Sequence, residues 1–554
     1  MNKKVCSFPI LFALLALLIG TCAVVFPASA QAAPTSNGSI TVSGTVASSY
    51  DAYQIFSANV VDGDNDAKIA TDLAWVSDAV RDAALPVLHG AGMPKSQTTA
   101  QEAAEWLNTD SHLTSALSAQ LARSLQSSGV VSVALNAGTA AELPCGYWLI
   151  VADDDAIARG EAGTAPIMAL VGGSAVTVKP KAATPKVAKH VLEDSTAAWQ
   201  KAADATVADD LYWRLSATVP AGLTAYDTYT VQFVDTMSAG LDPSKVAASM
   251  HVYVAAGAEG GFDAVACEDG NVSSTPAKGW TDITAQCATK VAADGTFTVR
   301  TGDLIAALGG ADAFTAGARV VAVYNAPLNS ACNHGIAKGN PNEVYLRYPR
   351  SPFADQSGDA GFTRTPSDDA CAYTWDLALT KRGSDSDKPL AGAVLSIADD
   401  RGRTLAADGT WDAEGKATVT TGEDGRVTVS GVDSGKLEVR ELKAPKGYTA
   451  FEGTRSVTVK AEGLDVDQVA AAKPKLTITA ESPLRADSAD GSTGSLEASL
   501  INTPTGTPPS ITTGGFMPST GDMAMYAAAA VAVAGAALIV VALLVKRGGG
   551  SHKE

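Results

Sequence analysis

Most of the chain consists of short runs in which apolar and polar residues alternate, and this feature restricts its fold more than any other. The runs include SITVSGTV, TYTVQFVD, VYLRYP, WDLALTK, GKLEVRE and SLEASLIN, with Gly, Asp, Asn and Pro between them. Side chains along a β-strand point alternately to the two faces of its sheet, so each run predicts a strand with one buried face. Short strands separated by such turns are typical of antiparallel β-sandwiches. We therefore predict a mainly β protein of tandem immunoglobulin-like sandwich domains.

One region departs from this pattern. Residues 98–129 are rich in Ala, Leu and Gln and poor in β-branched residues, which predicts one or two helices inside the first domain. Stretches rich in Pro, Gly, Lys or Thr then indicate domain boundaries. The predicted boundaries are a junction at 179–189, a polar linker at 351–369 and a spacer within 502–516. The predicted units are a first domain at 36–180, a middle sandwich at 184–350, a last sandwich at 372–505 and a spacer at 506–516.

The two ends of the chain have the composition of targeting segments. Two lysines and an apolar run precede Ala28-Ser29-Ala30, which is a small-x-small cleavage site, so residues 1–30 are predicted to be a secretory signal peptide. Cleavage after Ala33 is the alternative. Near the other end, residues 523–545 contain no charged side chain, and a basic tail follows them. This length is sufficient for a transmembrane helix, with the cationic tail on the cytoplasmic side.

The net charge argues against one class of partner, and the cysteine content leaves disulfides open. The formal net charge of −18 argues against a nucleic-acid partner, which requires a basic surface. Five of the seven cysteines lie beyond the signal peptide, in a part of the chain exported to an oxidising compartment that permits disulfides. Cys267 with Cys287 and Cys332 with Cys371 are the candidate pairs, which leaves Cys145 as a buried free thiol.

The sequence contains none of the motifs that would indicate an enzyme. No cysteine or histidine cluster has the spacing of zinc ligands, and the six histidines are scattered, so we expect no metal and no cofactor. There is no nucleotide-binding loop, no Gly-x-Ser-x-Gly elbow and no Cys/His nucleophile pair. A secreted or surface hydrolase is an alternative that a substrate screen would test.

In the last sandwich, three polar residues continue apolar faces. Lys381 follows Trp375, Leu377 and Leu379 at every second position. Glu441 continues the face of Leu437 and Val439, and Asn502 continues the face of Leu496, Ala498 and Leu500. The alternation therefore predicts that a lysine, an acid and an asparagine point into one core.

The middle sandwich repeats this set of residue types. Lys189 shares a face with Val187 and Val191, Asp235 with Tyr229, Val231 and Phe233, and Asn342 with Val344, Leu346 and Tyr348. For any one of these residues, a strand-end position in contact with water or a buried ion pair would be the simpler interpretation. The recurrence of the whole set in two domains favours a shared chemistry instead.

That chemistry follows from desolvation. Burial favours the neutral amine of lysine and the protonated form of a carboxyl group. A neutral amine can attack the side-chain carbonyl of asparagine, while the acid polarises that carbonyl and transfers protons. Ammonia leaves and an isopeptide bond remains. The predicted bonds are Lys381–Asn502 with Glu441, and Lys189–Asn342 with Asp235.

Together with these lysine, acid and asparagine sets, further motifs make the chain resemble a known family. This family is the SpaA-type backbone pilins of Gram-positive bacteria, which are assembled by sortases. LEVRELKAPKGY (437–448) resembles the E-box of these pilins, with Glu441 at the glutamate position, although Leu437 and Leu442 depart from the usual Tyr and Thr. KPLAGAVLSI (388–397) resembles the start of a collagen-adhesin B-type domain. VQFVDTMSAGL and GNPNEVYLRY resemble the fimbrial isopeptide-forming middle domain, of the collagen-adhesin A type.

The resemblance also explains the segment before the apolar tail. Met517-Pro518-Ser519-Thr520-Gly521 is similar to the Leu-Pro-x-Thr-Gly sorting signal, with Met517 in place of Leu. It implies that a sortase cuts between Thr520 and Gly521 and passes the Thr520 carboxyl to an amine. In the family that amine is the lysine of a Tyr-Pro-Lys motif. Here Lys179-Pro180-Lys181 places Lys181 at that position, with Lys179 as the alternative.

The resemblance implies a non-enzymatic shaft subunit of a surface pilus that is covalently attached to the cell wall. Its implied partners are pilin-specific and housekeeping sortases, other copies of itself, tip and base pilins, and peptidoglycan. A monomeric wall-anchored adhesin or ancillary pilin, in which Lys181 is unused, is the main alternative. The sequence names no host ligand.

Overall fold

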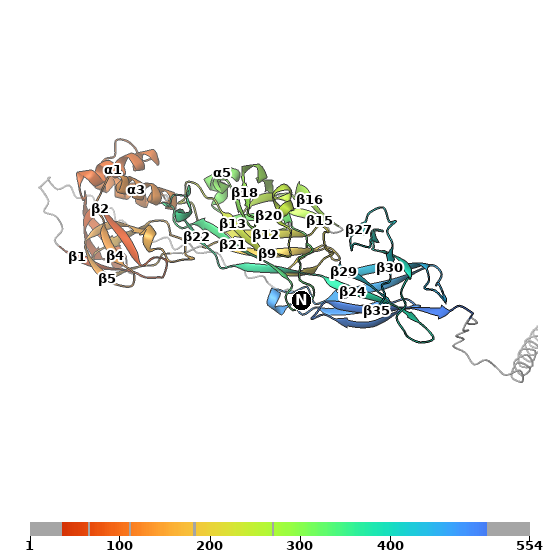
Figure 1. The fold of residues 1–554 in the computed structure, drawn as a ribbon. Coiled ribbons are helices and arrows are strands. Elements are labelled where there is room, and N and C mark those ends of the chain that lie inside the picture. The colour runs from red at the N-terminus through yellow and green to blue at the C-terminus, as the bar shows by residue number, and fades with distance from the viewer. Residues whose placement is uncertain (1–35, 65–66, 110–111, 181–183, 269–270, 507–554) are drawn as a thin grey trace, which may run out of the picture.

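The computed structural model describes residues 36–64, 67–109, 112–180, 184–268 and 271–506. They form three bodies in a row (Figure 1), which we call the N-terminal, middle and C-terminal domains. The predicted signal peptide, most of the spacer, the sorting signal and Lys181 lie outside the described residues. Within the described ranges, no helix combines the length and the apolar character needed to cross a bilayer.

The N-terminal domain combines two sheets with three helices. Thr99 caps α2 by accepting a hydrogen bond from the backbone of Glu102, whose side chain in turn accepts one from the Thr99 backbone. Helices α2 and α3 fall within the helical stretch predicted at 98–129, whereas α1 was not predicted. The helices are α1 Asp78–Gly90, α2 Ala100–Asn108 and α3 Ser115–Ser127. The sheets have the orders β5-β1-β8 and β3-β2-β6-β7, with β4 on β2. The strands are β1 Asn37–Val42, β2 Ser49–Asp62, β3 Lys68–Trp75, β4 Val133–Asn136, β5 Ala140–Pro144, β6 Gly146–Ala152, β7 Ile167–Val171 and β8 Val176–Val178.

The middle domain is a sandwich of two large sheets. One has the order β10-β9-β12-β20-β14-β17, and the other β11-β23-β21-β13-β19-β18 with β22 on β21. A separate hairpin, β15-β16, lies outside them. The strands of the first sheet are β9 Lys186–Glu193, β10 Ala198–Gln200, β12 Tyr212–Val219, β14 His251–Ala256, β17 Thr281–Asp282 and β20 Ala318–Asn325. Those of the second are β11 Ala202–Asp204, β13 Gln232–Met237, β18 Ala288–Val291, β19 Thr296–Arg300, β21 Asn340–Pro349, β22 Phe362–Arg364 and β23 Asp368–Tyr373. The hairpin strands are β15 Val265–Glu268 and β16 Asn271–Pro276, and the short helices are α4 Val246–Ser249, α5 Leu304–Ala307 and α6 Ala311–Phe314.

The C-terminal domain is a second two-sheet unit. One sheet has the order β29-β24-β35-β31 with β34 on β35, and the other β27-β26-β25-β30-β32-β33 with β28 on β25. The strands that come first and last in the sequence of this domain, β24 and β35, lie side by side in the first sheet and pair in parallel. The strands are β24 Trp375–Gly383, β25 Val394–Ala398, β26 Thr404–Leu405, β27 Trp411–Asp412, β28 Val419–Thr420, β29 Arg426–Val432, β30 Gly435–Lys443, β31 Tyr448–Thr449, β32 Thr454–Glu462, β33 Lys475–Ala480, β34 Leu484–Asp490 and β35 Ser495–Pro504.

The predicted linker at 351–369 differs from the structure. It contains β22 and the first residues of β23, and both strands pair with β21, so the second sheet of the middle domain continues to Tyr373. Only Thr374 separates β23 from β24. Residues 351–361 do lie in turns and a short 3-10 helix, as the polar composition indicated, but residues 362–364 and 368–369 belong to strands.

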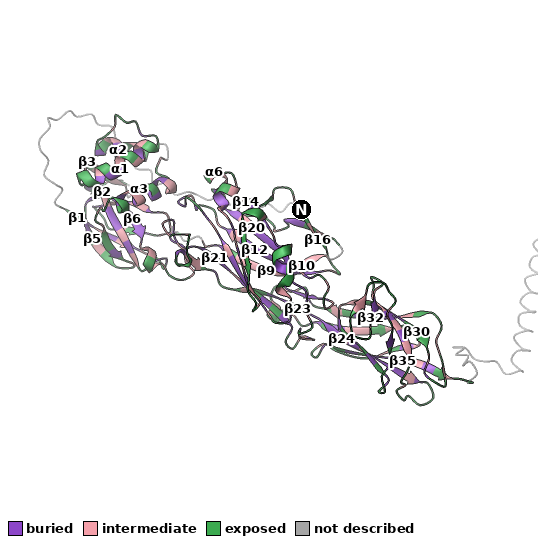
Figure 2. Cartoon of the chain, turned by 45° about the horizontal axis from the view of Figure 1, so that its top comes forward, coloured by how far each residue is buried: buried purple, intermediate pink, exposed green. Residues whose placement is uncertain are grey.

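Buried and exposed positions alternate along strands such as β21, β29 and β30 (Figure 2), as the sequence pattern predicts, whereas the central strand β20 is buried along nearly its whole length. On β21, for example, Asn340, Asn342 and Val344 are buried and Pro341 and Glu343 are exposed. The prediction of a mainly β chain of tandem sandwich domains is confirmed.

Candidate functional sites in two sandwich cores

The structure brings the three predicted residues of the middle domain together inside its core. Lys189 comes from β9 in one sheet, and Asp235 and Asn342 come from β13 and β21 in the other. All three are fully buried. The Lys189 ammonium forms a hydrogen-bonded ion pair with Asp235 Oδ2. The trio therefore spans the gap between the two sheets.

The surroundings of Lys189 favour the neutral form of its amine. Burial lowers the pKa of Lys189 to about 8, although the Asp235 carboxylate opposes this shift. Burial also raises the pKa of Asp235 above its ordinary value, against the opposing effect of Lys189. Both shifts move the pair toward a neutral amine and a protonated acid, which are the forms that amide exchange requires.

A residue that the sequence analysis missed lies at the centre of this site. Tyr324, on β20, is fully buried, and its hydroxyl oxygen accepts hydrogen bonds from Lys189 Nζ at 2.9 Å and from Asn342 Nδ2 at 2.8 Å. The hydroxyl donates to Asp235 Oδ2 at 3.1 Å. In the sequence, Tyr324 shares its face with Val320 and Ala322, so it could have been predicted as buried but not as a partner of the trio.

The C-terminal domain brings its own trio together in a different arrangement. Lys381 on β24 and Asn502 on β35 belong to neighbouring strands of one sheet, and Glu441 reaches them from β30 in the other. Asn502 Nδ2 donates to both Glu441 carboxylate oxygens, at 2.9 and 3.0 Å. Lys381 Nζ donates to the Leu500 carbonyl oxygen at 3.0 Å and lies 4.0 Å from Glu441 Oε1.

Lys381 is also poised to lose its proton. Its side chain is fully buried, and this burial lowers the pKa of Lys381 to about 8, with Glu441 opposing the shift. Asn502 and Glu441 are both more than nine-tenths buried. The backbone of Phe451 donates to Glu441 Oε2 at 3.1 Å and helps to fix the carboxylate.

Both sites share one unusual feature, an asparagine carbonyl oxygen that is buried without a partner. Among the described residues, no group donates a hydrogen bond to Asn342 Oδ1 or to Asn502 Oδ1. An unpaired buried polar atom costs about 1–3 kcal/mol. A proton donor brought to either of these oxygens would polarise the carbonyl carbon.

The other predicted site residues have different outcomes. Lys181, Thr520 and the rest of the sorting signal lie outside the described residues. Lys179 is exposed just after β8. No group of three or more His, Cys, Asp or Glu residues in the described part of the chain is arranged to hold a metal ion.

The structure contradicts both predicted disulfides. The five described cysteines are free, including the buried Cys145, for which a free thiol was expected. The Cys332 sulfur lies 3.6 Å from His334 Nε2, whereas the Cys371 sulfur lies against Gly339, the residue just before β21. The number and spacing of cysteines leave their pairing undetermined, which is why the sequence could not exclude these pairs.

Cys332 and His334 also form a contact that the sequence did not suggest. His334 Nδ1 lies 2.8 Å from Asp376 Oδ1, so the three side chains have the order of a nucleophile, a base and an acid. Burial raises the pKa of the Cys332 thiol to about 11. Because the thiolate is the reactive form, this arrangement does not supply an activated nucleophile near neutral pH.

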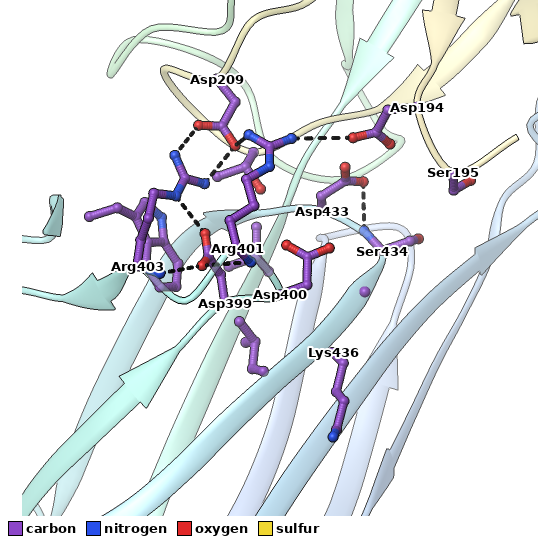
Figure 3. Close-up of a pocket in the computed structure, with 15 residues that line it drawn as sticks. Asp194, Ser195, Asp209, Asp399, Asp400, Arg401, Arg403, Asp433, Ser434 and Lys436 are labelled. Carbon is purple, nitrogen blue, oxygen red and sulfur yellow. Dashed lines mark hydrogen bonds and ion pairs between the residues drawn. The ribbon is translucent and has the colours of Figure 1, made fainter. Parts of the chain in front are cut away.

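A hollow between the middle and C-terminal domains is occupied by ion pairs (Figure 3). Asp209 of the middle domain accepts hydrogen bonds from Arg401, at 2.8 Å, and from Arg403, at 2.7 Å, of the C-terminal domain. Arg403 also donates to Asp399 at 2.6 Å. Because these ion pairs join a carboxylate of one domain to two arginines of the other, we interpret the hollow as a contact that stabilises the junction between the domains.

Comparison with known proteins gives a match to one family profile and to one curated protein. Residues 376–473 match the family profile described as SpaA, a prealbumin-like fold domain. Over 143 residues the chain is 31% identical to the trypsin-resistant surface T6 protein of Streptococcus pyogenes serotype M6 (strain ATCC BAA-946 / MGAS10394). This match covers 24% of each protein, so the chain spans about a quarter of the length of this curated relative.

Solved structures give likenesses at low identity. The T6 backbone pilin of serotype M6 Streptococcus pyogenes is 17% identical with a TM-score of 0.45, over 86% of this chain and 100% of that chain. The full-length major pilin SpaD from Corynebacterium diphtheriae is 15% identical with a TM-score of 0.40, over 86% of this chain and 99% of that one. The family profile and the curated relative support the resemblance to backbone pilins that the sequence motifs indicate.

Proposed function

We propose that this chain, whose C-terminal domain matches the SpaA prealbumin-like fold, is the backbone subunit of a covalent surface pilus. The observation that carries the proposal is the pair of buried Lys–acid–Asn trios in consecutive domains. A structural protein that is pulled along its length benefits from covalent ties inside each domain. Burying a lysine, a carboxyl group and an amide has a cost in free energy that a purely structural core would avoid.

The intramolecular reaction is an amide exchange. The neutral lysine nitrogen bonds to the asparagine Cγ, the Cγ–Nδ2 bond breaks, and one proton passes from the lysine nitrogen to the leaving ammonia. This transfer goes through the protonated acid, Asp235 or Glu441, which supplies a proton for the leaving nitrogen and takes up the proton that the lysine nitrogen releases. Each trio reacts once per molecule, so the protein is not an enzyme in the sense of turnover.

The intermolecular linkage is the second part of the proposal. A sortase would cleave between Thr520 and Gly521 and join the Thr520 carboxyl to Lys181 of the next subunit, and a housekeeping sortase would attach the finished fibre to peptidoglycan. Two features support this. The sorting-signal sequence precedes an apolar segment with a basic tail, and the exposed residues Thr177 and Lys179 lead into Lys181.

The test is expression of the chain with its own pilin sortase and analysis of cell-wall extracts on denaturing gels. We expect a ladder of covalent multimers from the wild type, its loss in Lys181→Ala and its retention in the neighbouring control Lys179→Ala. Loss in Lys179→Ala alone would move the linkage to Lys179. Absence of a ladder from the wild type would favour the monomeric wall-anchored adhesin.

A further inference from the structure

The two trios differ in how the acid reaches the amide. In the C-terminal site, Glu441 contacts Asn502 directly through both carboxylate oxygens. In the middle site, Asp235 is one methylene shorter and contacts Lys189 instead. Its link to Asn342 runs through the Tyr324 hydroxyl, which lies 3.1 Å from Asp235 Oδ2 and 2.8 Å from Asn342 Nδ2.

Tyr324 therefore touches every group that takes part in the reaction. Its hydroxyl accepts a hydrogen bond from the attacking nitrogen, Lys189 Nζ, and another from the leaving nitrogen, Asn342 Nδ2. Its aromatic ring packs edge-on against Phe297, with 4.8 Å between the ring centroids, and this contact helps to hold the ring in place. In the C-terminal site, no described hydroxyl group bonds to Lys381, Glu441 or Asn502; the Leu500 carbonyl oxygen holds the lysine instead.

We propose that Tyr324 is a catalytic proton relay of the middle-domain bond, in which its hydroxyl group connects the short side chain of Asp235 to the leaving nitrogen of Asn342. This inference rests on the proposed Lys189–Asn342 bond and adds a fourth residue to its chemistry. Asp235 begins protonated. Tyr324 gives its own proton to Nδ2 and takes the Asp235 proton in its place, and the Asp235 carboxylate then accepts the proton that Lys189 Nζ releases on bonding to Cγ. Ammonia leaves, and Asp235 and Tyr324 both end in the protonated form in which they began.

Burial keeps the relay in its protonated form. Tyr324 is fully buried, and desolvation raises the pKa of its hydroxyl well above the ordinary value. The hydroxyl therefore keeps its proton near neutral pH and can donate it when a neighbouring acid replaces that proton.

The chain offers a matched control for removing this hydroxyl. Tyr229 is also fully buried in the middle-domain core, and among the described residues its hydroxyl has no hydrogen-bond partner. Tyr229→Phe thus deletes the same atom from the same core without touching the trio. The rate at which the Lys381–Asn502 bond forms in the same molecule provides an internal reference, because a general folding defect would slow that bond as well.

The experiment follows bond formation in the region from about residue 34 to 516 after synthesis in a cell-free system. Samples are quenched at intervals in acidic urea, and peptide mapping by mass spectrometry assigns each loss of ammonia to its domain. In Tyr324→Phe we expect the Lys189–Asn342 bond to form about tenfold or more slowly, because a general acid contributes at least that factor. The Lys381–Asn502 bond should form at the wild-type rate, and Tyr229→Phe should match the wild type at both sites.

A second variant that restores bond formation distinguishes a proton-relay role of Tyr324 from a merely structural one. In Tyr324→Phe combined with Asp235→Glu, the longer acid should reach Asn342 directly, as Glu441 reaches Asn502, and restore bond formation. A wild-type rate in Tyr324→Phe, an equal loss in Tyr229→Phe, or no rescue by Asp235→Glu would each overturn the relay. Absence of the middle bond from the wild type would instead overturn the proposed function.

Discussion

The middle and C-terminal domains present the same three chemical groups in two different geometries. In the middle domain the lysine faces the acid and the amide across the gap between two sheets, and the Tyr324 hydroxyl connects them. In the C-terminal domain the lysine and the amide lie on paired strands of one sheet, and only Glu441 comes from the opposite sheet. What the two sites share is complete burial of the amine, which lowers the pKa of each lysine to about 8.

This difference suggests different mechanical roles for the two proposed bonds. A Lys189–Asn342 bond would fasten one sheet of the middle sandwich to the other. A Lys381–Asn502 bond would fasten the first strand of the C-terminal domain to its last, so that tension entering at β24 passes directly to β35 and the tail.

The largest expected effect comes from removing the acids. Asp235→Ala should abolish the middle bond and leave the C-terminal bond complete, and Glu441→Ala should do the reverse, because each acid serves only its own trio. Peptide mapping by mass spectrometry measures both bonds in one sample. A variant that loses both bonds would show that the sites are coupled through folding, and a variant that keeps both would remove the acids from the mechanism.

A smaller effect is expected on stability. The two bonds close loops of about 150 and about 120 residues, for which chain entropy predicts a stabilisation on the order of 5 kcal/mol each. Asn342→Ala and Asn502→Ala should therefore lower the urea midpoint of their own domains by similar amounts. Limited proteolysis during the titration would assign each transition to its domain. A much larger loss in Asn342→Ala would mean that fastening the two sheets stabilises more than loop closure alone.

The smallest expected effect is on the pH dependence of bond formation. The reactive form of each trio is a neutral lysine with a protonated acid, so the pair holds one proton in total. Since both lysines have a pKa of about 8, the pair loses that proton as the pH rises above about 8. The rate at both sites should then fall, by about tenfold per pH unit at most. A rate that rises from pH 8 to pH 10 at either site would show that its acid acts in the ionised form.

The alternation of side chains was sufficient to predict the six trio residues and the sandwich fold. It succeeded because a strand has only two faces, so every second residue of a run such as TWDLALTK shares one environment. Alternation could not reveal Tyr324 as a partner. A tyrosine on an inward face is ordinary in a core, and its hydrogen bonds depend on how two sheets are aligned.

The other failures have the same origin in long-range geometry. The first two residues of β23, Asp368 and Asp369, were assigned to the polar linker because their pairing with β21 is not visible in the local pattern of residues. Helix α1 was missed although Ser77 caps it by accepting a hydrogen bond from Val80, in part because Pro86 interrupts the helical pattern. The cysteine pairs failed because spacing does not determine pairing.

Whether both trios react can be read from the intact mass of the wild-type region from about residue 34 to 516, measured under reducing conditions. Each isopeptide bond removes one ammonia. We predict a mass lower than that of the plain sequence by two ammonias, with one restored in Glu441→Ala and one in Asp235→Ala. A mass equal to that of the plain sequence would contradict the account and leave the buried trios as unreacted polar clusters.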